Sequence, residues 1–121
     1  MTHAFGQSRG DELLIWDGHR VWRLAEVLPV ESVSLGVFQS VLENRHSRFW
    51  PKEEQAPTHL EIASYVKRIS DVDLAYPIIL SAEGEVMDGL HRLTKAWMLG
   101  VETIRAVRFP VTPEPDERRP L

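Results

Sequence analysis

The chain has 121 residues, of which 43% are hydrophobic and 26% are charged, so it can build one hydrophobic core but not two ordinary domains. It contains no cysteine, which excludes disulfides, thiolate zinc sites and cysteine nucleophiles. Its formal net charge of −4 disfavours binding to nucleic acid through phosphate neutralisation, because that mode needs a basic face. No apolar run approaches the roughly 20 residues of a membrane-spanning helix, so we expect a cytoplasmic protein that does not enter a membrane.

The two ends of the chain lack the patterns of regular structure. Residues 1–11 are polar and contain glycine without periodicity, which predicts a flexible N-terminal arm. Residues 111–121 combine three prolines with charged side chains, so the segment is poor in backbone donors and in apolar surface. We expect a Pro-rich disordered tail there and an ordered domain over residues 12–110.

The first half of this domain is predicted to contain a hairpin, a helix and a loop. Residues 13–16 and 21–24 are short apolar runs on either side of Asp17-Gly18, a dipeptide common in hairpin turns, which predicts two strands. Over residues 34–44 the apolar side chains recur at helical spacing behind a serine placed to cap, which predicts a short helix. Residues 45–57 have no periodicity and are predicted to form a long surface loop.

The second half begins with a helix and a hairpin. Thr58 and Glu61 have the spacing of a capping box, and the apolar residues after them predict a helix that ends near Ser70. Residues 77–81 form a short apolar run of the buried-strand type, and a Glu-Gly turn leads from it into residues 85–88. These two segments are predicted to pair as strands.

A helix and a last strand complete the pattern. Residues 90–99 supply an apolar helical face, and Gly100 stands where a left-handed C-terminal cap is expected. A closing strand is predicted near residues 103–109. We expect an α+β domain with a small mixed sheet flanked by helices.

The segment Asp88-Gly89-Leu90-His91-Arg92, between a strand and a helix, predicts an anion-binding turn. The first N–H groups of a helix have no intrahelical partner and its dipole favours an anion, so phosphate is the natural ligand. Gly89, Leu90 and His91 are expected to offer backbone N–H groups, and His91 and Arg92 to neutralise the phosphate. Asp88 is expected to orient a substrate hydroxyl, to hold a magnesium ion or to cap the helix. The alternative is an ordinary capped turn with solvated side chains.

Residues 77–80, 84–96 and 104–107 follow in order a pattern of apolar strand, glycine turn, strand entering DG-x-HR, helix with small residues and closing strand. This pattern resembles the core of the ParB/sulfiredoxin-like superfamily, and the match extends over residues 58–109. Residues 24–31 are similar to the first strand of that family and the loop after it. The resemblance implies a single ParB/sulfiredoxin-like domain that binds phosphate at residues 88–92.

Two branches of the superfamily fit this chain poorly. Sulfiredoxins carry a catalytic cysteine just before the His-Arg pair, where this chain has Leu90, so their reduction of a sulfinic acid has no nucleophile here. ParB partition proteins bind cytidine triphosphate through a G-E-R-R motif and read DNA through a following helix-turn-helix domain. Gly89 and Arg92 match that motif whereas Leu90 and His91 depart from it, and we expect no DNA-reading domain, so DNA is a disfavoured partner.

The third branch contains kinases of free serine, whose DGHHR-type motif is similar to residues 88–92 except at Leu90. In those kinases a glutamate after the first strand is the general base, and Glu31 lies at the corresponding place. The resemblance thus implies Glu31, Asp88 and His91 as catalytic residues. It also implies a nucleotide cofactor, ATP, ADP or CTP, with Mg²⁺ contacted by Asp88. We expect no structural metal, because no recognised ligand spacing occurs.

Two classes of function stay open at this point. The first is a nucleotide-binding enzyme that transfers a phosphoryl group to a small hydroxyl substrate or hydrolyses the nucleotide, since an anion site and magnesium supply most of that chemistry. The second is a non-catalytic ParB-like module that binds DNA or a protein and uses the nucleotide as a switch. The missing first His of the kinase motif argues against the first class, and the acidic balance argues against DNA. A homodimer is compatible with either class.

Overall fold

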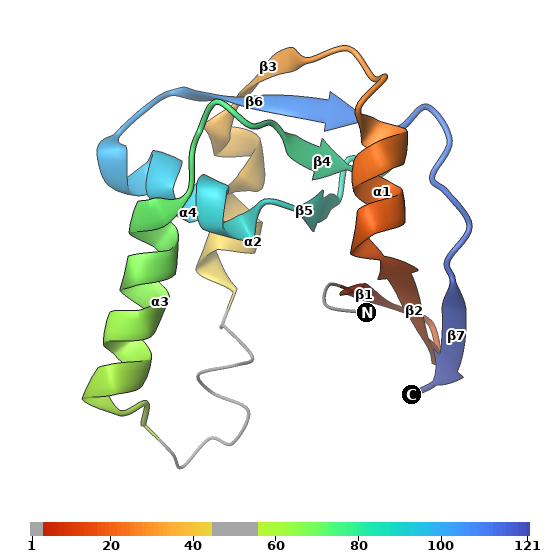
Figure 1. Ribbon diagram of the computed structural model, residues 1–121, viewed down its shortest axis with the longest axis horizontal. Helices are drawn as coiled ribbons and strands as arrows, with labels where there is room; N and C mark the ends of the chain where they lie inside the picture. The colour runs from red at the N-terminus through yellow and green to blue at the C-terminus, as the bar shows by residue number, and fades with distance from the viewer. Residues whose placement is uncertain (1–3, 45–55) are drawn as a thin grey trace. The chain divides into compact units, whose positions relative to one another are not determined.

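The computed structural model describes residues 4–44 and 56–121 (Figure 1). In chain order the elements are β1 (Ala4–Arg9), β2 (Glu12–Asp17), α1 (Gly18–Ala25), β3 (Glu31–Ser34), the 3-10 helix η1 (Leu35–Phe38), α2 (Gln39–Glu43), α3 (His59–Asp71), β4 (Ile78–Leu80), β5 (Val86–Asp88), α4 (Leu90–Leu99), β6 (Thr103–Arg108) and β7 (Glu117–Pro120). None of the helices in the described part of the chain is long and apolar enough to cross a membrane.

The strands form two small sheets. One has the order β1-β2-β7 and the other the order β3-β6-β4-β5. β4 pairs parallel with β6 and antiparallel with β5, so the second sheet is mixed. The predicted α+β class, with its small mixed sheet and helices, is confirmed.

The chain forms two compact units, each assembled from distant segments. Unit 1 comprises Met1–Glu31, Ile78–Asp88 and Ala106–Leu121, and unit 2 comprises Ser32–Pro77 and Gly89–Arg105. Neither unit can form until segments that are far apart in the sequence pack together, so local sequence signals alone do not reveal this division.

The core of unit 1 gathers side chains from α1 and from both sheets. Its buried members are Leu14, Trp16, Val21, Ala25, Ile79, Val107 and Phe109. On β2 the buried side chains alternate with half-buried ones, as expected of a strand with one face on a core. Burial of a valine, leucine, isoleucine or phenylalanine side chain stabilises the fold by about 1.5–3 kcal/mol.

α1 stands where the second strand of a hairpin was predicted, so that prediction is wrong. Residues 21–24 lie inside this helix, and Asp17 is its N-cap residue. Val21 and Ala25, four residues apart, are the side chains that the helix buries together with Gly18. The β propensity of a short Val-Trp run was overridden because a helical face here covers the core.

β1 corrects the prediction of a flexible N-terminal arm. It pairs antiparallel with β2, from Ala4 opposite Asp17 to Arg9 opposite Glu12. Gly10, at φ 62°, provides the left-handed residue in the tight turn between the two strands. No side chain of β1 is fully buried, so the strand has no hydrophobic periodicity to detect and is held by its backbone pairing.

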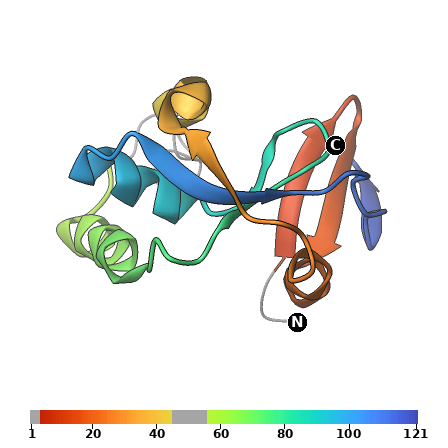
Figure 2. The same cartoon turned by 90° about the horizontal axis from the view of Figure 1, so that it is seen from above.

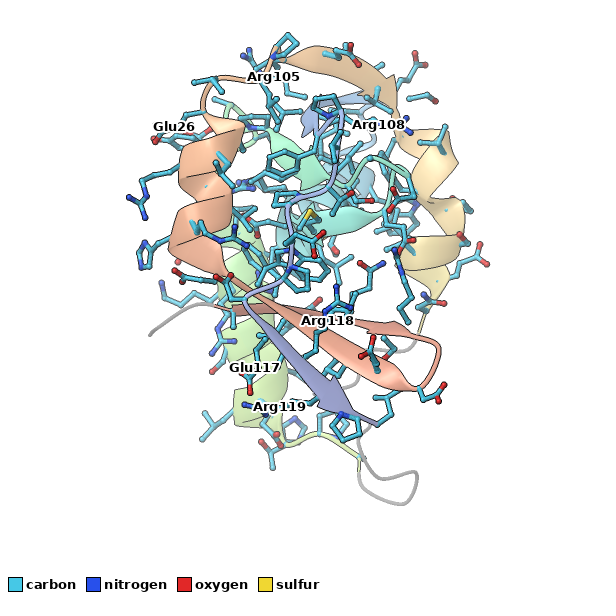
Figure 3. All side chains as sticks on the ribbon, turned by 90° about the vertical axis from the view of Figure 1, so that its right-hand side faces the viewer. Glu26, Arg105, Arg108, Glu117, Arg118 and Arg119 are labelled. Atoms are coloured by element: carbon cyan, nitrogen blue, oxygen red, sulfur yellow. The ribbon has the colours of Figure 1, made fainter. Side chains whose placement is uncertain are left out.

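β7 likewise corrects the prediction of a disordered tail. It pairs antiparallel with β2, on the side that β1 leaves open, and Figure 2 shows the three strands side by side. All residues of β7 are exposed, and Figure 3 shows Glu117, Arg118 and Arg119 along this strand. Arg118 reaches Glu12 of β2 at 3.3 Å. Backbone pairing, which the composition does not report, orders this segment.

The segment before β7 is held against β2 and α1 by polar contacts. Trp16 donates from Nε1 to the Pro113 carbonyl at 2.8 Å. The Asp116 carboxylate accepts from the Asp17 backbone N–H at 2.7 Å and pairs with Arg20 at 3.1 Å. That backbone hydrogen bond and, secondarily, the Arg20 charge lower the pKa of Asp116 below its ordinary value of 3.8. Proline lacks a backbone N–H, but these contacts are made by the Pro113 carbonyl, the Asp17 N–H and the side chains of Trp16, Asp116 and Arg20. The prolines therefore do not prevent them.

Unit 2 packs helices around α4. Figure 1 shows α4 crossing close to the C-terminal end of α3, where Lys95 donates from Nζ to the Ser70 and Val72 carbonyls at 2.8 and 2.7 Å. A lysine in this place satisfies the last carbonyls of a helix. The buried apolar residues of this unit are Leu35, Phe38, Ile69, Leu93, Ala96 and Ile104.

The helix predicted over residues 34–44 is only partly right. Ser34 ends β3 and makes no side-chain cap bond in the described structure, η1 follows it, and α2 begins only at Gln39. Leu35 and Phe38 are the buried residues of η1, and their spacing of three is the repeat of a 3-10 helix. The predicted loop over residues 45–57 lies, as far as residue 55, outside the described residues.

The predicted elements between residues 58 and 109 are confirmed, whereas residues 24–31, expected as a strand and the loop after it, contain the end of α1, a turn and the first residue of β3. α3 begins with the predicted capping box: Thr58 Oγ1 accepts from the Glu61 N–H at 3.1 Å, and Glu61 Oε1 accepts from the Thr58 N–H at 2.9 Å. β4 and β5 form the predicted pair, and α4 ends at Gly100 in the left-handed conformation with φ 72°. β6 occupies the predicted closing strand.

Deleting residues 111–121 is expected to lower the melting temperature by more than about 4 °C, because β7 and the Trp16 hydrogen bond are lost together. Thermal denaturation followed by circular dichroism measures this. Arg119→Ala is the control, since it removes only an exposed ion pair with Glu117, a contact that contributes little in water. A truncated protein that melts with the parent would show that the tail adds no stability.

Asp116 is expected to make stability depend on pH on the acid side. A carboxyl whose pKa is lower in the folded than in the unfolded state stabilises the fold at pH values above its unfolded-state pKa. That stabilisation is lost as the pH falls through the folded-state pKa. The melting temperatures of the parent and of Asp116→Asn should therefore differ most above roughly pH 5 and converge toward roughly pH 3. A difference that stays constant across that range would contradict a charged role for this side chain.

Candidate functional site

The candidate site is the turn from β5 into α4. β5 ends at Asp88, Gly89 is the N-cap residue with φ 121° and ψ 18°, and α4 begins at Leu90. This φ lies in the region that disfavours a Cβ, so the geometry of the turn requires glycine. Gly89 is also buried, which leaves little room for a larger residue to relax.

The first turn of α4 has the electrostatics of an anion site. The first helical hydrogen bond runs from the Leu93 N–H to the Gly89 carbonyl at 2.9 Å, so the N–H groups of Leu90, His91 and Arg92 precede it. This turn contains no acidic side chain, and glycine at the cap brings no side-chain oxygen over it. The positive end of the helix dipole is thus not offset by a carboxylate within its own first turn.

His91 lies against α3. Its ring makes an edge-on contact with Tyr65, with centroids 5.4 Å apart and an interplanar angle of 69°. Burial raises the pKa of Tyr65 above its ordinary value of 10.0, while a hydrogen bond with Thr94 opposes that shift. A tyrosine phenol is neutral at physiological pH with or without this shift, so the ring beside His91 does not repel an anion.

Arg92 is half-buried and directed by the backbone of its own unit. Its Nη1 donates to the Pro77 carbonyl at 3.4 Å, which is longer than an ordinary N–H to oxygen bond. A guanidinium has five N–H donors in a planar fork, so a contact to one carbonyl is compatible with a second, anionic acceptor. The residue is neither fully exposed nor sealed in the core.

Asp88 is held by a residue of α1 within unit 1. Its Oδ2 accepts a hydrogen bond from Trp22 Nε1 at 3.0 Å, and the contact is partly buried. The expectation that Asp88 caps the helix is corrected, because Gly89 occupies the cap position of α4. A carboxylate is a hard oxygen ligand of the kind that Mg²⁺ prefers, so the side chain fits the predicted metal contact.

Glu31, the predicted general base, is the exposed first residue of β3. β3 and β5 are the two edge strands of their sheet, with β6 and β4 between them. The strand order does not place Glu31 beside Asp88, and its role as base stays a prediction.

Two residues that contact the site were missed by sequence reasoning. Trp22 was assigned to a strand, and only its place in α1 directs its indole to Asp88. Tyr65 lies three residues after Ile62 and four before the buried Ile69, a spacing that puts it on the apolar face of α3. That spacing was the signal by which Tyr65 could have been found.

The described residues contain no group of three or more histidine, aspartate or glutamate side chains placed to hold a metal ion. Comparison with protein-family models, with curated proteins and with solved structures found no significant match to the chain. The resemblance to the ParB/sulfiredoxin-like superfamily stays a prediction from the sequence.

Gly89→Ala is expected to destabilise the protein by about 1–3 kcal/mol, because alanine must adopt the strained φ of this position. Gly100→Ala is the matched control: Gly100 caps the other end of the same helix at φ 72°, where a Cβ would meet nothing within 4 Å. That φ is close to the left-handed region that other residues visit, so the control should cost about 1 kcal/mol. Urea denaturation measures the free energy of unfolding of both variants. If both lose the same free energy, the conformation at position 89 requires glycine no more than that at position 100 does.

Proposed function

We propose that the turn from Gly89 to Arg92 binds the phosphate groups of a nucleotide or of another phosphate-bearing small molecule. The observation that carries the proposal is a glycine cap at φ 121° followed by a helical first turn without an acidic side chain and with Arg92 in it. Backbone N–H groups and the helix dipole attract the anion, and the guanidinium adds charge-assisted hydrogen bonds. Leu90 contributes its N–H only, since its side chain is apolar.

Asp88 is the proposed contact for magnesium. Mg²⁺ in phosphate sites usually binds one or two carboxylates and completes its octahedron with phosphate oxygens and water. A single aspartate next to a phosphate-binding turn is enough for that arrangement. The ion would neutralise charge on the phosphates when bound.

The reaction that we propose is phosphoryl transfer from a nucleotide to a small hydroxyl substrate, or hydrolysis of the nucleotide, in the cytoplasm. Such reactions depend mainly on positioning and on electrostatic stabilisation, which an anion site and magnesium supply. Within this scheme His91 and Arg92 bind phosphate and Asp88 orients the metal or the hydroxyl. Glu31 remains the candidate base, and ATP, ADP and CTP are the candidate nucleotides.

The second candidate is a non-catalytic ParB-like module that uses a nucleotide as a switch for a protein partner. The order of strands favours it, because β3 and β5 are not neighbours in the sheet and the pairing does not bring Glu31 next to Asp88. DNA is the less favoured partner, given the net charge of −4. In both candidates the phosphate site is the same.

A thermal-shift screen decides whether the site exists and which nucleotide it takes. ATP, ADP, AMP, CTP and inorganic phosphate are each added with and without MgCl₂, because a ligand that binds the folded state raises the melting temperature. Release of phosphate or transfer to free serine then separates the enzyme from the binding module. If none of the nucleotides shifts the melting temperature at millimolar concentration, the proposal fails.

Arg92→Ala is expected to weaken nucleotide binding by about 10- to 100-fold, since it removes a charge-assisted contact worth roughly 1.5–3 kcal/mol. Isothermal calorimetry measures the affinity. Arg105→Ala is the matched control, an exposed arginine of the same unit on β6 that should leave the affinity unchanged. Equal affinity in the parent and in Arg92→Ala would remove Arg92 from the site.

Asp88→Asn is expected to separate metal binding from phosphate binding. Asparagine keeps the shape of the side chain and an oxygen that can accept from Trp22, but it loses the charge that holds magnesium. Binding of the nucleotide without magnesium should persist, while the gain in affinity on adding MgCl₂ and any turnover should decline. An unaltered dependence on magnesium would place the metal elsewhere.

A further inference from the structure

Residues 17–20, Asp-Gly-His-Arg, are similar to the Asp-Gly-Leu-His-Arg segment of residues 88–92, and the proposed function does not use them. In the structure they start α1: Asp17 is the N-cap residue and Gly18 is the first residue of the helix. Arg20 pairs with Asp116 of the C-terminal segment. His19 lies edge-on to Trp22, with ring centroids 5.1 Å apart and an interplanar angle of 80°. The motif therefore builds and supports the helix that carries Trp22.

The indole of Trp22 is held from several sides. Besides His19, Phe5 of β1 contacts it edge-on, with centroids 6.2 Å apart. Trp22 is half-buried and packs against the core of unit 1, as do Leu28 and Met87. Edge-on aromatic pairs favour one orientation of the ring, so the Nε1–H has a defined direction. The N–H points to Asp88 Oδ2, which lies 3.0 Å from Trp22 Nε1.

The chemistry of this bond distinguishes it from an ion pair. An indole N–H donates a hydrogen bond but carries no charge, so it orients a carboxylate without neutralising it. Partners of this kind, which contact the ligand of a metal rather than the metal itself, set the direction of that ligand.

We propose that Trp22 is a positioning residue that holds the Asp88 carboxylate in the direction needed for magnesium. The inference rests on the proposed function, since it names the support of the proposed metal contact. All residues that carry it, from β1, α1 and β5, belong to unit 1. Trp22 is not a catalytic residue in this scheme, because it acts only through Asp88.

The alternative is a tryptophan that simply satisfies its N–H at the edge of the core. Trp16 is an example in the same unit, since its Nε1 donates to the Pro113 backbone carbonyl at 2.8 Å. Replacement of either tryptophan by phenylalanine keeps an aromatic ring and removes one indole hydrogen bond. Trp16→Phe is thus the matched control for Trp22→Phe: it removes more packing, because Trp16 is buried and Trp22 is half-buried, but has no direct effect on Asp88.

The first measurement follows the indole N–H signals of the full-length protein in ¹⁵N–¹H spectra. Trp22→Phe identifies the Trp22 signal by its disappearance. Asp88→Asn is expected to shift that signal, because a neutral acceptor polarises the N–H less than a carboxylate does. Addition of MgCl₂ with ATP to the parent should also shift it. A Trp22 signal that does not respond to Asp88→Asn overturns the inference.

The second measurement compares ATP affinity with and without MgCl₂ by calorimetry. In Trp22→Phe the affinity for Mg²⁺ in the presence of ATP should fall by roughly 10- to 100-fold, the usual effect of losing such a supporting partner. Affinity for ATP without magnesium should stay unchanged, and Trp16→Phe should behave as the parent does in both conditions. A purely structural role would affect the two tryptophan variants alike.

The outcomes separate this inference from the proposed function. If the parent binds ATP with magnesium and Trp22→Phe binds it with the same dependence on magnesium, the inference is wrong and the phosphate site stands. If Trp16→Phe loses the same dependence as Trp22→Phe, the effect is general destabilisation and the inference is wrong as well. If the parent binds no ATP in either condition, the proposed function and the inference fall together.

Discussion

The backbone conformation of Gly89 is the constraint on which the candidate site depends. At φ 121° the chain leaves β5 and enters α4 within one residue, without a side chain over the first turn of the helix. A residue with a Cβ would either resist this φ or force the helix to begin elsewhere, and the N–H groups of the first turn would then point differently. Geometry at one glycine thereby determines whether an anion can approach the helix along its dipole.

The residues on the two sides of Gly89 are supported by different neighbours. Asp88 takes its hydrogen bond from Trp22 of α1, and Arg92 donates to the Pro77 carbonyl before β4. The hydrogen bond of Asp88 lies within unit 1, and that of Arg92 lies within unit 2.

The strand β2 is the structural centre of unit 1, because it pairs with both ends of the described chain. β1 lies on one side of it and β7 on the other. Its inward side chains belong to the same core as Val21 of α1, the helix that presents Trp22. The support of Asp88 consequently depends on residues near both termini, although neither end of the chain has a hydrophobic pattern of its own.

The sequence by itself determined the elements whose signals are local. The Thr58–Glu61 capping box, the apolar run of β4 with the turn into β5, and the cap at Gly100 all act between residues a few positions apart, so they can be read directly. β1, β7 and the helix α1 were decided by the tertiary structure, because backbone pairing with a distant strand and burial against a distant core leave little trace in local composition. The same reason explains the site: residues 88–92 were visible as a motif, whereas the contacts of Trp22 with Asp88 and of Tyr65 with His91 join residues far apart in the chain and exist only once it has folded.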